Sequence, residues 1–257
     1  MRGERLNDGL SAVAVGEGLP LVTLPGLGQG ADLAVRVPRL AALSAKALAG
    51  GFRRRVHLVN RPVRAPAGMT LADLAGWHAT ALRSRFGEPV DVWGTSGGGV
   101  TALQLVLDHP GIVRRLVLCV AASRADPRSL RALARMMELE REGRSSAWVG
   151  SGLIADGPLR LLLLAAYGLA RGRPREAGEA ALVAAAQNWD VTARLGEIGI
   201  PVLLVGGTRD RIFPPELVRA TADGIPGARL LLLPGRGHTS ALFDRRTKPA
   251  IADFLAG

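Results

Sequence analysis

One stretch in the first half of the chain, residues 90–103, constrains the fold more than any other. It reads Val-Asp-Val-Trp-Gly-Thr-Ser-Gly-Gly-Gly-Val-Thr-Ala-Leu. A strand-like run ends at Gly94, the chain turns at Ser96, and an apolar helix is expected to continue to about His109. Gly94 and Gly98 lie two residues to either side of Ser96, where a tight strand-to-helix turn has no room for side chains. This G-x-S-x-G pattern predicts a nucleophile elbow that exposes the Ser96 hydroxyl.

A glycine-rich turn of this kind can also be a plain connection, or a loop that binds phosphate. Phosphate-binding turns follow G-x-G-x-x-G or end in G-K-[ST], and neither pattern occurs in this stretch. A serine hydroxyl is a poor nucleophile unless a base lies within hydrogen-bond reach. The choice between a connection and a nucleophile therefore depends on the rest of the chain.

The length and composition favour one folded α/β domain. At 257 residues with 48% hydrophobic residues, the chain can bury a full core and has room for an inserted subdomain. The first eight residues contain no apolar run and no secretion signal. The most apolar stretch, residues 159–170, is far shorter than the about 20 residues that cross a bilayer. Cys119 is the single cysteine, so no intramolecular disulfide can form, and we expect a cytoplasmic protein without membrane contact.

The formal net charge of +11 raises the question of nucleic-acid binding. All but two of the 33 basic residues are arginine, which is typical of codon bias in a GC-rich genome. The positive charge is not concentrated in one patch, and aromatic residues make up only 4% of the chain. Binding to a polyanion requires a basic patch, with aromatic residues for single strands. We therefore expect no nucleic-acid partner.

Strand-like runs alternate with helical patterns over most of the chain, which predicts a parallel sheet covered by helices. The expected strands are residues 10–15, 19–24, 56–59, 90–93, 115–121, 200–205 and 229–233. The expected helices are residues 33–48, 70–85, 97–109, 214–223 and 240–255. The first two strands are expected to pair antiparallel across a Gly-Glu-Gly turn, and Thr70 with Asp73 to cap the helix that follows.

The alternation stops at residues 124–196, where no strand-like run occurs. This segment instead contains helical patterns at residues 126–141, 158–171 and 175–188. We therefore expect residues 1–123 and 197–257 to form one α/β core, and residues 124–196 to be an all-helical insertion.

His238 and Asp210 can supply the base and the acid that Ser96 needs. His238 lies in a glycine-rich loop after a hydrophobic strand, and Asp210 lies in the loop after the strand at residues 200–205. Both loops are expected at the carboxyl edge of the sheet, where an aspartate can orient the imidazole. Asp210 could instead cap the helix that begins near residue 214. The other three histidines are expected to be structural or surface residues.

With this arrangement the sequence resembles the α/β-hydrolase family. Ser96, Asp210 and His238 follow one another in the family's order along the chain. The resemblance covers essentially the whole chain, including the insertion after Ala121, where the family has its cap. It implies an α/β-hydrolase fold with a mostly parallel eight-stranded sheet and a helical cap, and a catalytic triad of these three residues. Some family members place the acid at a position that resembles Asp126.

An oxyanion hole needs two donors directed at the developing negative charge. The backbone N–H of Gly97 follows the nucleophile directly and would be the first donor. On resemblance, the backbone N–H of Leu27 in the segment Leu-Pro-Gly-Leu-Gly would be the second. Pro25 takes the place of the family's usual histidine, which changes the support of this loop. The alternative is a glycine turn that only connects two elements.

The insertion is expected to determine which substrate binds. Residues 161–170 are apolar around the whole helix and predict a hydrophobic cover over the site. The expected pocket residues are Trp148, Leu163, Tyr167 and Trp189. Each could equally belong to the core of the insertion.

The sequence thus predicts a serine hydrolase that acts on a small or medium apolar ester, thioester or lactone. No zinc-binding cluster, Walker A loop or dinucleotide fingerprint occurs, so no metal or cofactor is expected. The resemblance also allows C–C bond hydrolysis, release of an N-terminal proline, or acyl transfer. In the peptidase case, Glu138, Glu140 and Glu142 could hold a substrate amine. A ligand-binding protein with weak activity on the same fold remains an alternative, and the oligomeric state is left open.

Overall fold

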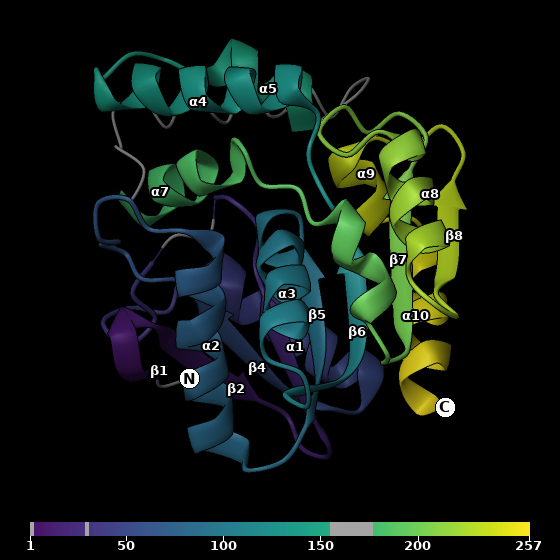
Figure 1. Cartoon of the computed structure of the whole chain (residues 1–257). Helices are drawn as coiled ribbons and strands as arrows, with labels where there is room; N and C mark the ends of the chain where they lie inside the picture. The colour runs from purple at the N-terminus through teal and green to yellow at the C-terminus, as the bar shows by residue number, and fades with distance from the viewer. Residues whose placement is uncertain (1–2, 29–30, 155–176) are drawn as a thin grey trace.

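The computed structural model describes residues 3–28, 31–154 and 177–257, which build an eight-stranded sheet with helices on both faces (Figure 1). The strands are β1 (Gly3–Arg5), β2 (Ser11–Val15), β3 (Pro20–Leu24), β4 (Arg55–Asn60), β5 (Val90–Thr95), β6 (Val113–Cys119), β7 (Val202–Gly207) and β8 (Arg229–Leu233). Their order across the sheet is β1-β2-β4-β3-β5-β6-β7-β8. The β1–β2 and β2–β4 pairs are antiparallel and the other five pairs are parallel, so the predicted mostly parallel sheet is confirmed.

The described helices follow the chain in this order. They are α1 (Arg39–Phe52), α2 (Leu71–Phe86), α3 (Gly97–Asp108), α4 (Pro127–Arg141), α5 (Ala147–Ile154), α7 (Ala177–Ala186), α8 (Pro215–Gly224), α9 (His238–Leu242) and α10 (Thr247–Ala256), with short 3-10 turns at η1 (Asn7–Gly9) and η2 (Thr192–Glu197). None of the helices in the described ranges has the length and apolar content to cross a bilayer.

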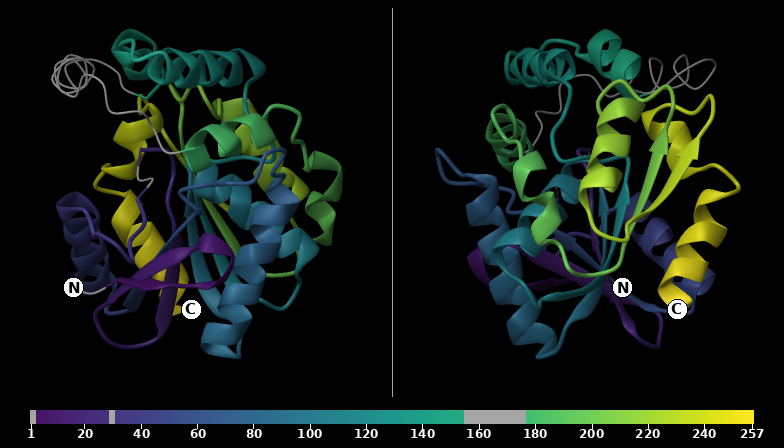
Figure 2. Two further views of the ribbon diagram at one scale, coloured as in Figure 1. Left: turned by 90° about the vertical axis from the view of Figure 1, so that its left-hand side faces the viewer. Right: turned by 45° about the vertical axis from the view of Figure 1, so that its right-hand side comes forward.

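Alternate side chains of the central strands enter two separate cores, one on each face of the sheet. Along β6, Leu116 and Leu118 belong to the core that includes side chains of α2, α3 and α8, whereas Val117 and Cys119 belong to the core that includes side chains of α1 and α10. All four side chains are fully buried. Figure 2 shows α1 and α10 together on one side of the sheet. Burial of one such side chain contributes about 1.5–3 kcal/mol, so these alternating runs determine the position of the sheet between two helical layers.

The predicted antiparallel pairing of the first two long strands is wrong. β4 lies between them and pairs antiparallel with β2 and parallel with β3. The turn between β2 and β3 passes close to the start of β4. A Cβ atom on Gly16 would lie 2.7 Å from the carbonyl oxygen of Arg54, and one on Gly18 would lie 2.9 Å from that of Arg53. The two glycines permit this close approach, and nothing local in the sequence shows that a third strand fills the gap.

Other elements differ from the sequence-based expectation for local reasons. β1 is an eighth strand of only three residues, too short to show a periodic pattern. α1 begins at Arg39, because Pro38 is in an extended conformation and the residue before a proline is disfavoured in a helix. The last expected helix is divided into α9 and α10 by a turn in which Asp244 accepts a hydrogen bond from the backbone of Arg246. The predicted capping box of Thr70 and Asp73 is confirmed at the start of α2.

The helices α4, α5 and α7 lie between β6 and β7 in the sequence and above the sheet in Figure 1. They stand beyond the carboxyl ends of the parallel strands, the edge that carries Ser96. The expected helix at residues 158–171, with Leu163 and Tyr167, lies outside the described residues.

Candidate active site

The turn at Ser96 has the geometry of a nucleophile elbow. Ser96 has φ 52° and ψ −121°, a conformation that costs a non-glycine residue about 1–3 kcal/mol. A Cβ atom on Gly98 would lie 2.0 Å from the carbonyl oxygen of Leu24, and one on Gly94 would lie 2.5 Å from the Cα atom of Gly99. Side chains at these two positions would collide with backbone. The glycines of the motif therefore permit the turn that places Ser96 between β5 and α3.

Ser96, His238 and Asp210 lie together at the carboxyl edge of the sheet. The Oγ atom of Ser96 is 3.0 Å from Nε2 of His238, and Nδ1 of His238 is 2.8 Å from Oδ2 of Asp210. The Oδ1 atom of Asp210 accepts hydrogen bonds from the backbone N–H groups of Ile212 and Phe213 at 2.9 and 3.1 Å. Because a carboxylate only accepts hydrogen bonds, Nδ1 carries the imidazole proton. Nε2 is then free to accept the proton of the serine hydroxyl.

The loops that carry Asp210 and His238 are joined by backbone hydrogen bonds. The N–H of Arg209 donates to the carbonyl of Arg236 at 2.8 Å. A Cβ atom on Gly207 would lie 2.2 Å from that same carbonyl oxygen, so the two loops approach as closely as a glycine permits. This contact sets the distance between the carboxylate and the imidazole.

The alternative acid, Asp126, has a different role in the structure. Its side chain accepts a hydrogen bond from the backbone of Ser129 at 2.9 Å and caps α4.

Two of the other histidines are buried away from the triad. Burial, with a smaller effect of Arg61, lowers the pKa of His78 to about 3. Burial, followed by the charges of two nearby arginines, lowers the pKa of His57 to about 4.

The residues of the two expected oxyanion donors both lie beside Ser96. Leu27 and Gly97 both line the cavity that contains Ser96. A Cβ atom on Gly26 would lie 3.1 Å from the Cβ atom of Ser96, so the Leu27 loop passes directly beside the nucleophile. Within the described residues, neither the Leu27 nor the Gly97 backbone N–H has a hydrogen-bond acceptor. Both donors are thus available to an oxygen atom bound near Ser96.

The cavity beside Ser96 is apolar. It is partly open to solvent, and none of the described residues that line it is charged. Its lining consists of Leu27, Ser96, Gly97, Val100, Ala125, Leu130, Leu133, Leu182, Val183, Ala186, Trp189, Ile212 and Phe213. The ring of Phe213 also stacks beside the imidazole of His238, with 6.1 Å between the ring centroids. The site can therefore accept an apolar group next to a serine and a histidine.

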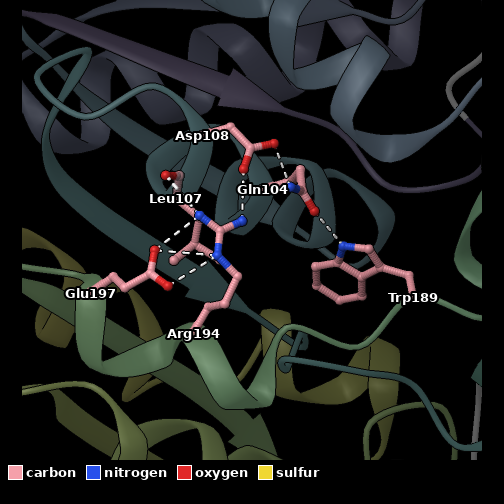
Figure 3. Close-up of polar contacts among 6 residues, drawn as sticks. All are labelled: Gln104, Leu107, Asp108, Trp189, Arg194 and Glu197. Atoms are coloured by element: carbon pink, nitrogen blue, oxygen red, sulfur yellow. Dashed lines mark hydrogen bonds and ion pairs between the residues drawn. The ribbon is translucent and has the colours of Figure 1, made fainter.

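Of the four expected pocket residues, the structure places Trp189 at the cavity. Its Nε1 atom donates to Oε1 of Gln104 at 2.6 Å, and the Gln104 amide donates to Asp108 (Figure 3). Arg194 donates to the other Asp108 oxygen at 2.8 Å and to the carboxylate of Glu197. Gln104 and Asp108 belong to α3, the helix that begins directly after Ser96. This network therefore fixes the indole relative to the nucleophile.

A second expected pocket residue, Trp148, is not among the described residues that line the cavity. Trp148 belongs to α5 and is 72% exposed. Leu163 and Tyr167 lie outside the described residues. The lining side chains of α4 and α7 were missed, although Leu130 and Leu133 have the i, i+3 spacing of one helix face.

The sequence reasoning also missed Arg61 and Glu179, which contact the loop of Leu27. Local patterns gave no sign of either residue, because the contacts join distant parts of the chain. Among the residues that the structure describes, no group of three or more histidine, cysteine or acidic side chains could hold a metal ion.

Comparisons with known proteins agree with the fold described above. A family model described as "Alpha/beta hydrolase family" matches residues 21–251. A protein of Variovorax paradoxus strain S110, named as a carbamate hydrolase, RutD, is 30% identical over 247 residues, which cover 89% of each chain. The pimeloyl-[acyl-carrier protein] methyl ester esterase of Neisseria meningitidis is 31% identical over 195 residues, covering 70% of this chain and 74% of the esterase.

Among solved structures, the enol-lactonase of Burkholderia xenovorans LB400 superimposes with a TM-score of 0.75. The alignment covers 99% of this chain and 100% of the lactonase, at 23% sequence identity. At this identity the similarity shows the shared fold.

Proposed function

Because this chain belongs to the alpha/beta hydrolase family and is a hydrolase, we propose that it cleaves an apolar carboxylic ester through an acyl-enzyme on Ser96. The observation that most supports this proposal is the position of Ser96. Its hydroxyl contacts His238, which contacts Asp210, and it opens onto an apolar cavity. A thioester or a lactone has the same reacting carbonyl and belongs to the same substrate class.

In the proposed reaction, the Oγ atom of Ser96 attacks the acyl carbonyl carbon while its proton passes to Nε2 of His238. The carbonyl oxygen becomes an oxyanion, which the N–H groups of Leu27 and Gly97 stabilise. The intermediate expels the alcohol, which takes the proton from His238, and the acyl group stays on Ser96. Water then attacks the acyl carbon with His238 as base. Collapse of this second intermediate releases the acid and returns the proton to Ser96.

The lining of the cavity supports an acyl chain as the bound group. Among the described lining residues, every side chain other than Ser96 is aliphatic, aromatic or absent, so burial of each substrate methylene is favourable by about 0.8 kcal/mol. A substrate with a charge on its acyl part would lose its hydration without gaining an ionic partner from the lining residues.

A carbamate is the second candidate, since several bacterial relatives are named as carbamate hydrolases. The same triad could attack a carbamate carbonyl. The apolar lining favours the ester, because its described residues include few polar side chains that could bind a carbamate nitrogen. Release of an N-terminal proline has less support. Glu138 and Glu142 pair with Arg135 and Arg144, and no glutamate lines the cavity among the described residues.

We also propose that residues 124–196 act as a cap on a core of residues 1–123 and 197–257. The cavity supports this division, because its lining alternates between the two parts. Leu27, Ser96 and Phe213 come from the core, whereas Leu133 and Leu182 come from the insertion.

The test is hydrolysis of p-nitrophenyl esters from acetate to decanoate, compared with an N-alkyl carbamate of p-nitrophenol. We expect turnover of the esters, with kcat/KM rising about three- to fourfold per methylene until the cavity is filled. Ser96→Ala should remove this activity and leave the fold intact. A purified protein that binds the esters without turnover would instead be a ligand-binding protein. A kcat/KM higher for the carbamate than for every ester would contradict the ester proposal.

A further inference from the structure

Two buried charged residues contact the backbone on both sides of Leu27, the second oxyanion donor. Arg61, directly after β4, donates from Nη2 to the carbonyl oxygens of the two residues before Leu27, at 2.8 and 2.6 Å. Glu179, in the first turn of α7, accepts a hydrogen bond from the backbone N–H of Gly28 at 2.7 Å. The loop is thus held from one side by the core and from the other by the insertion.

These contacts fix the two peptide units that flank Leu27. The Gly26 carbonyl and the Leu27 N–H belong to one planar peptide unit and point in opposite directions. When Arg61 binds that carbonyl, it also sets the direction of the Leu27 N–H. Glu179 fixes the next peptide unit through the N–H of Gly28. Because glycines occupy both positions next to Leu27, these units could otherwise rotate at little cost.

Arg61 and Glu179 also form an ion pair with each other. Nη1 of Arg61 lies 3.7 Å from Oε1 of Glu179, and the two side chains are 5% and 3% exposed. Charges at this depth are stable only when they are paired and hydrogen-bonded. A change in either charge therefore alters the environment of the other, and with it the contacts to the loop.

The start of α7 lies in direct backbone contact with the core, which brings Glu179 within reach of the loop. The N–H of Gly178 donates to the carbonyl of Val63 at 2.9 Å. A Cβ atom on Gly178 would lie 1.9 Å from the carbonyl oxygen of Pro62. Only a glycine permits this approach. The position of α7 and the position of the Leu27 loop are therefore coupled.

We propose that Arg61 and Glu179 are positioning residues that orient the Leu27 N–H, so that the oxyanion hole is complete only when α7 is docked on the core. This inference rests on the proposed function. It also gives a physical account of Pro25, which stands where the family's usual histidine is expected. In this chain an arginine and a glutamate from two distant segments supply the support of the loop.

A purely structural role for the pair is the alternative, and it predicts a different result. Loss of a structural ion pair lowers the free energy of unfolding but leaves the kinetics of the remaining folded enzyme unchanged. Loss of a positioning pair weakens binding of a tetrahedral oxyanion more than binding of a planar ground state. The comparison therefore needs a transition-state mimic together with a measurement of stability.

The variants are Glu179→Ala and Glu179→Gln. The matched control is Asp91→Asn. Asp91 is also a fully buried carboxylate paired with arginine, and its distance to Arg114 is 2.9 Å. It lies at the start of β5, away from Ser96. For each protein, kcat and KM for p-nitrophenyl butyrate are measured together with urea unfolding. Inhibition constants are measured for an arylboronic acid, which forms a tetrahedral anion on serine, and for the planar product butyrate.

For Glu179→Ala we expect kcat to fall about 10²-fold or more, as for loss of one oxyanion donor, with KM and butyrate inhibition little changed. Inhibition by the boronic acid should weaken by a similar factor. Glu179→Gln keeps an acceptor for Gly28 but removes the charge opposite Arg61, so its loss should be smaller, about tenfold. Asp91→Asn should lose stability without a change in kcat of the folded enzyme.

Wild-type kcat and boronic-acid inhibition in Glu179→Ala would overturn the inference. A loss of kcat in Asp91→Asn as large as that in Glu179→Ala would overturn it as well, since it would trace the loss to stability. If Glu179→Ala does not fold, unchanged constants in Glu179→Gln would be the contradicting result. A wild-type protein that neither hydrolyses the ester nor binds the boronic acid would instead contradict the proposed function.

Discussion

Asp210 contacts His238 through one carboxylate oxygen, at 2.8 Å, while its other oxygen accepts two backbone hydrogen bonds from the turn that follows. Asp210 is only 3% exposed. Its carboxylate therefore contacts the imidazole in a fixed orientation, with little competition from water. The same contact fixes the tautomer in which Nε2 faces Ser96.

We predict that Asp210→Asn lowers kcat for an ester by about 10²–10⁴-fold, because the amide removes the stabilising charge and can present its NH₂ group to Nδ1. Asp126→Asn should leave kcat near the wild-type value, since that carboxylate only caps α4. Steady-state kinetics on both variants, with circular dichroism as a check of folding, provide the measurement. A severe loss in Asp126→Asn with a mild one in Asp210→Asn would show that the acid is misassigned.

Leu182 should limit the length of the acyl chain. Its Cδ2 atom lies 2.8 Å from the position that a Cβ atom on Gly97 would occupy, so this side chain stands directly beside the elbow. Leu182→Ala should therefore make the preferred acyl chain of the p-nitrophenyl ester longer by about two to three methylenes. Burial of each methylene is favourable by about 0.8 kcal/mol. The matched control is Leu139→Ala, a buried leucine of α4 outside the cavity. An identical shift in this control would mean that general loosening, and not the cavity, sets the preference.

The hydrogen bond from Trp189 to Gln104 should increase the selectivity of the enzyme for acyl chains of one length. Trp189→Phe keeps an aromatic side chain but removes the donor, which leaves Gln104 without this partner at a cost of about 1–3 kcal/mol. We expect a lower free energy of unfolding and a flatter dependence of kcat/KM on chain length. The ester series and urea unfolding measure the two effects. An unchanged length profile would show that the network supports stability alone.

The fold should lose stability in mild acid because two buried histidines are held neutral. The folded-state pKa is about 3 for His78 and about 4 for His57, whereas an unfolded histidine titrates near 6.5. Below about pH 6.5 the unfolded chain therefore binds more protons, and the free energy of unfolding falls by up to about 1.4 kcal/mol per pH unit for each histidine. Their contribution is fully present above about pH 6.5.

His78→Leu should accordingly reduce the difference in stability between about pH 7 and pH 5 by about 2 kcal/mol. Urea unfolding at both pH values gives this difference directly. The same difference in the variant and the wild type would mean that His78 gains a proton without unfolding of the chain.

The parts of the site that follow from short sequence patterns could be predicted. The strained turn at Ser96 requires glycines two residues away on both sides, so G-x-S-x-G carries its own structural reason. Asp210 and His238 each follow a buried strand of a parallel sheet, and the carboxyl ends of such strands meet at one edge. The alternation of strands and helices was sufficient to predict a mostly parallel sheet covered by helices, but not the order of its strands.

The parts that depend on long-range contacts could not be predicted. The placement of β4 between β2 and β3 depends on strand pairing, and hydrophobic periodicity does not encode which neighbour a strand selects. The hydrogen bond from Gly28 to Glu179 joins residues 151 positions apart. Before the fold is known, Arg61 and Glu179 are two charged residues among many, and their burial as a pair is what identifies them.

The most direct test of the central claim is the reaction of the protein with a fluorophosphonate, which phosphonylates only a serine activated as a nucleophile. Intact mass spectrometry followed by peptide mapping gives both the number of labels and their position. We expect one label per chain, on the peptide that contains Ser96, with no label on Ser96→Ala and much slower labelling of His238→Ala. A label on another residue, or equal labelling of Ser96→Ala, would contradict the assignment of Ser96 as the nucleophile.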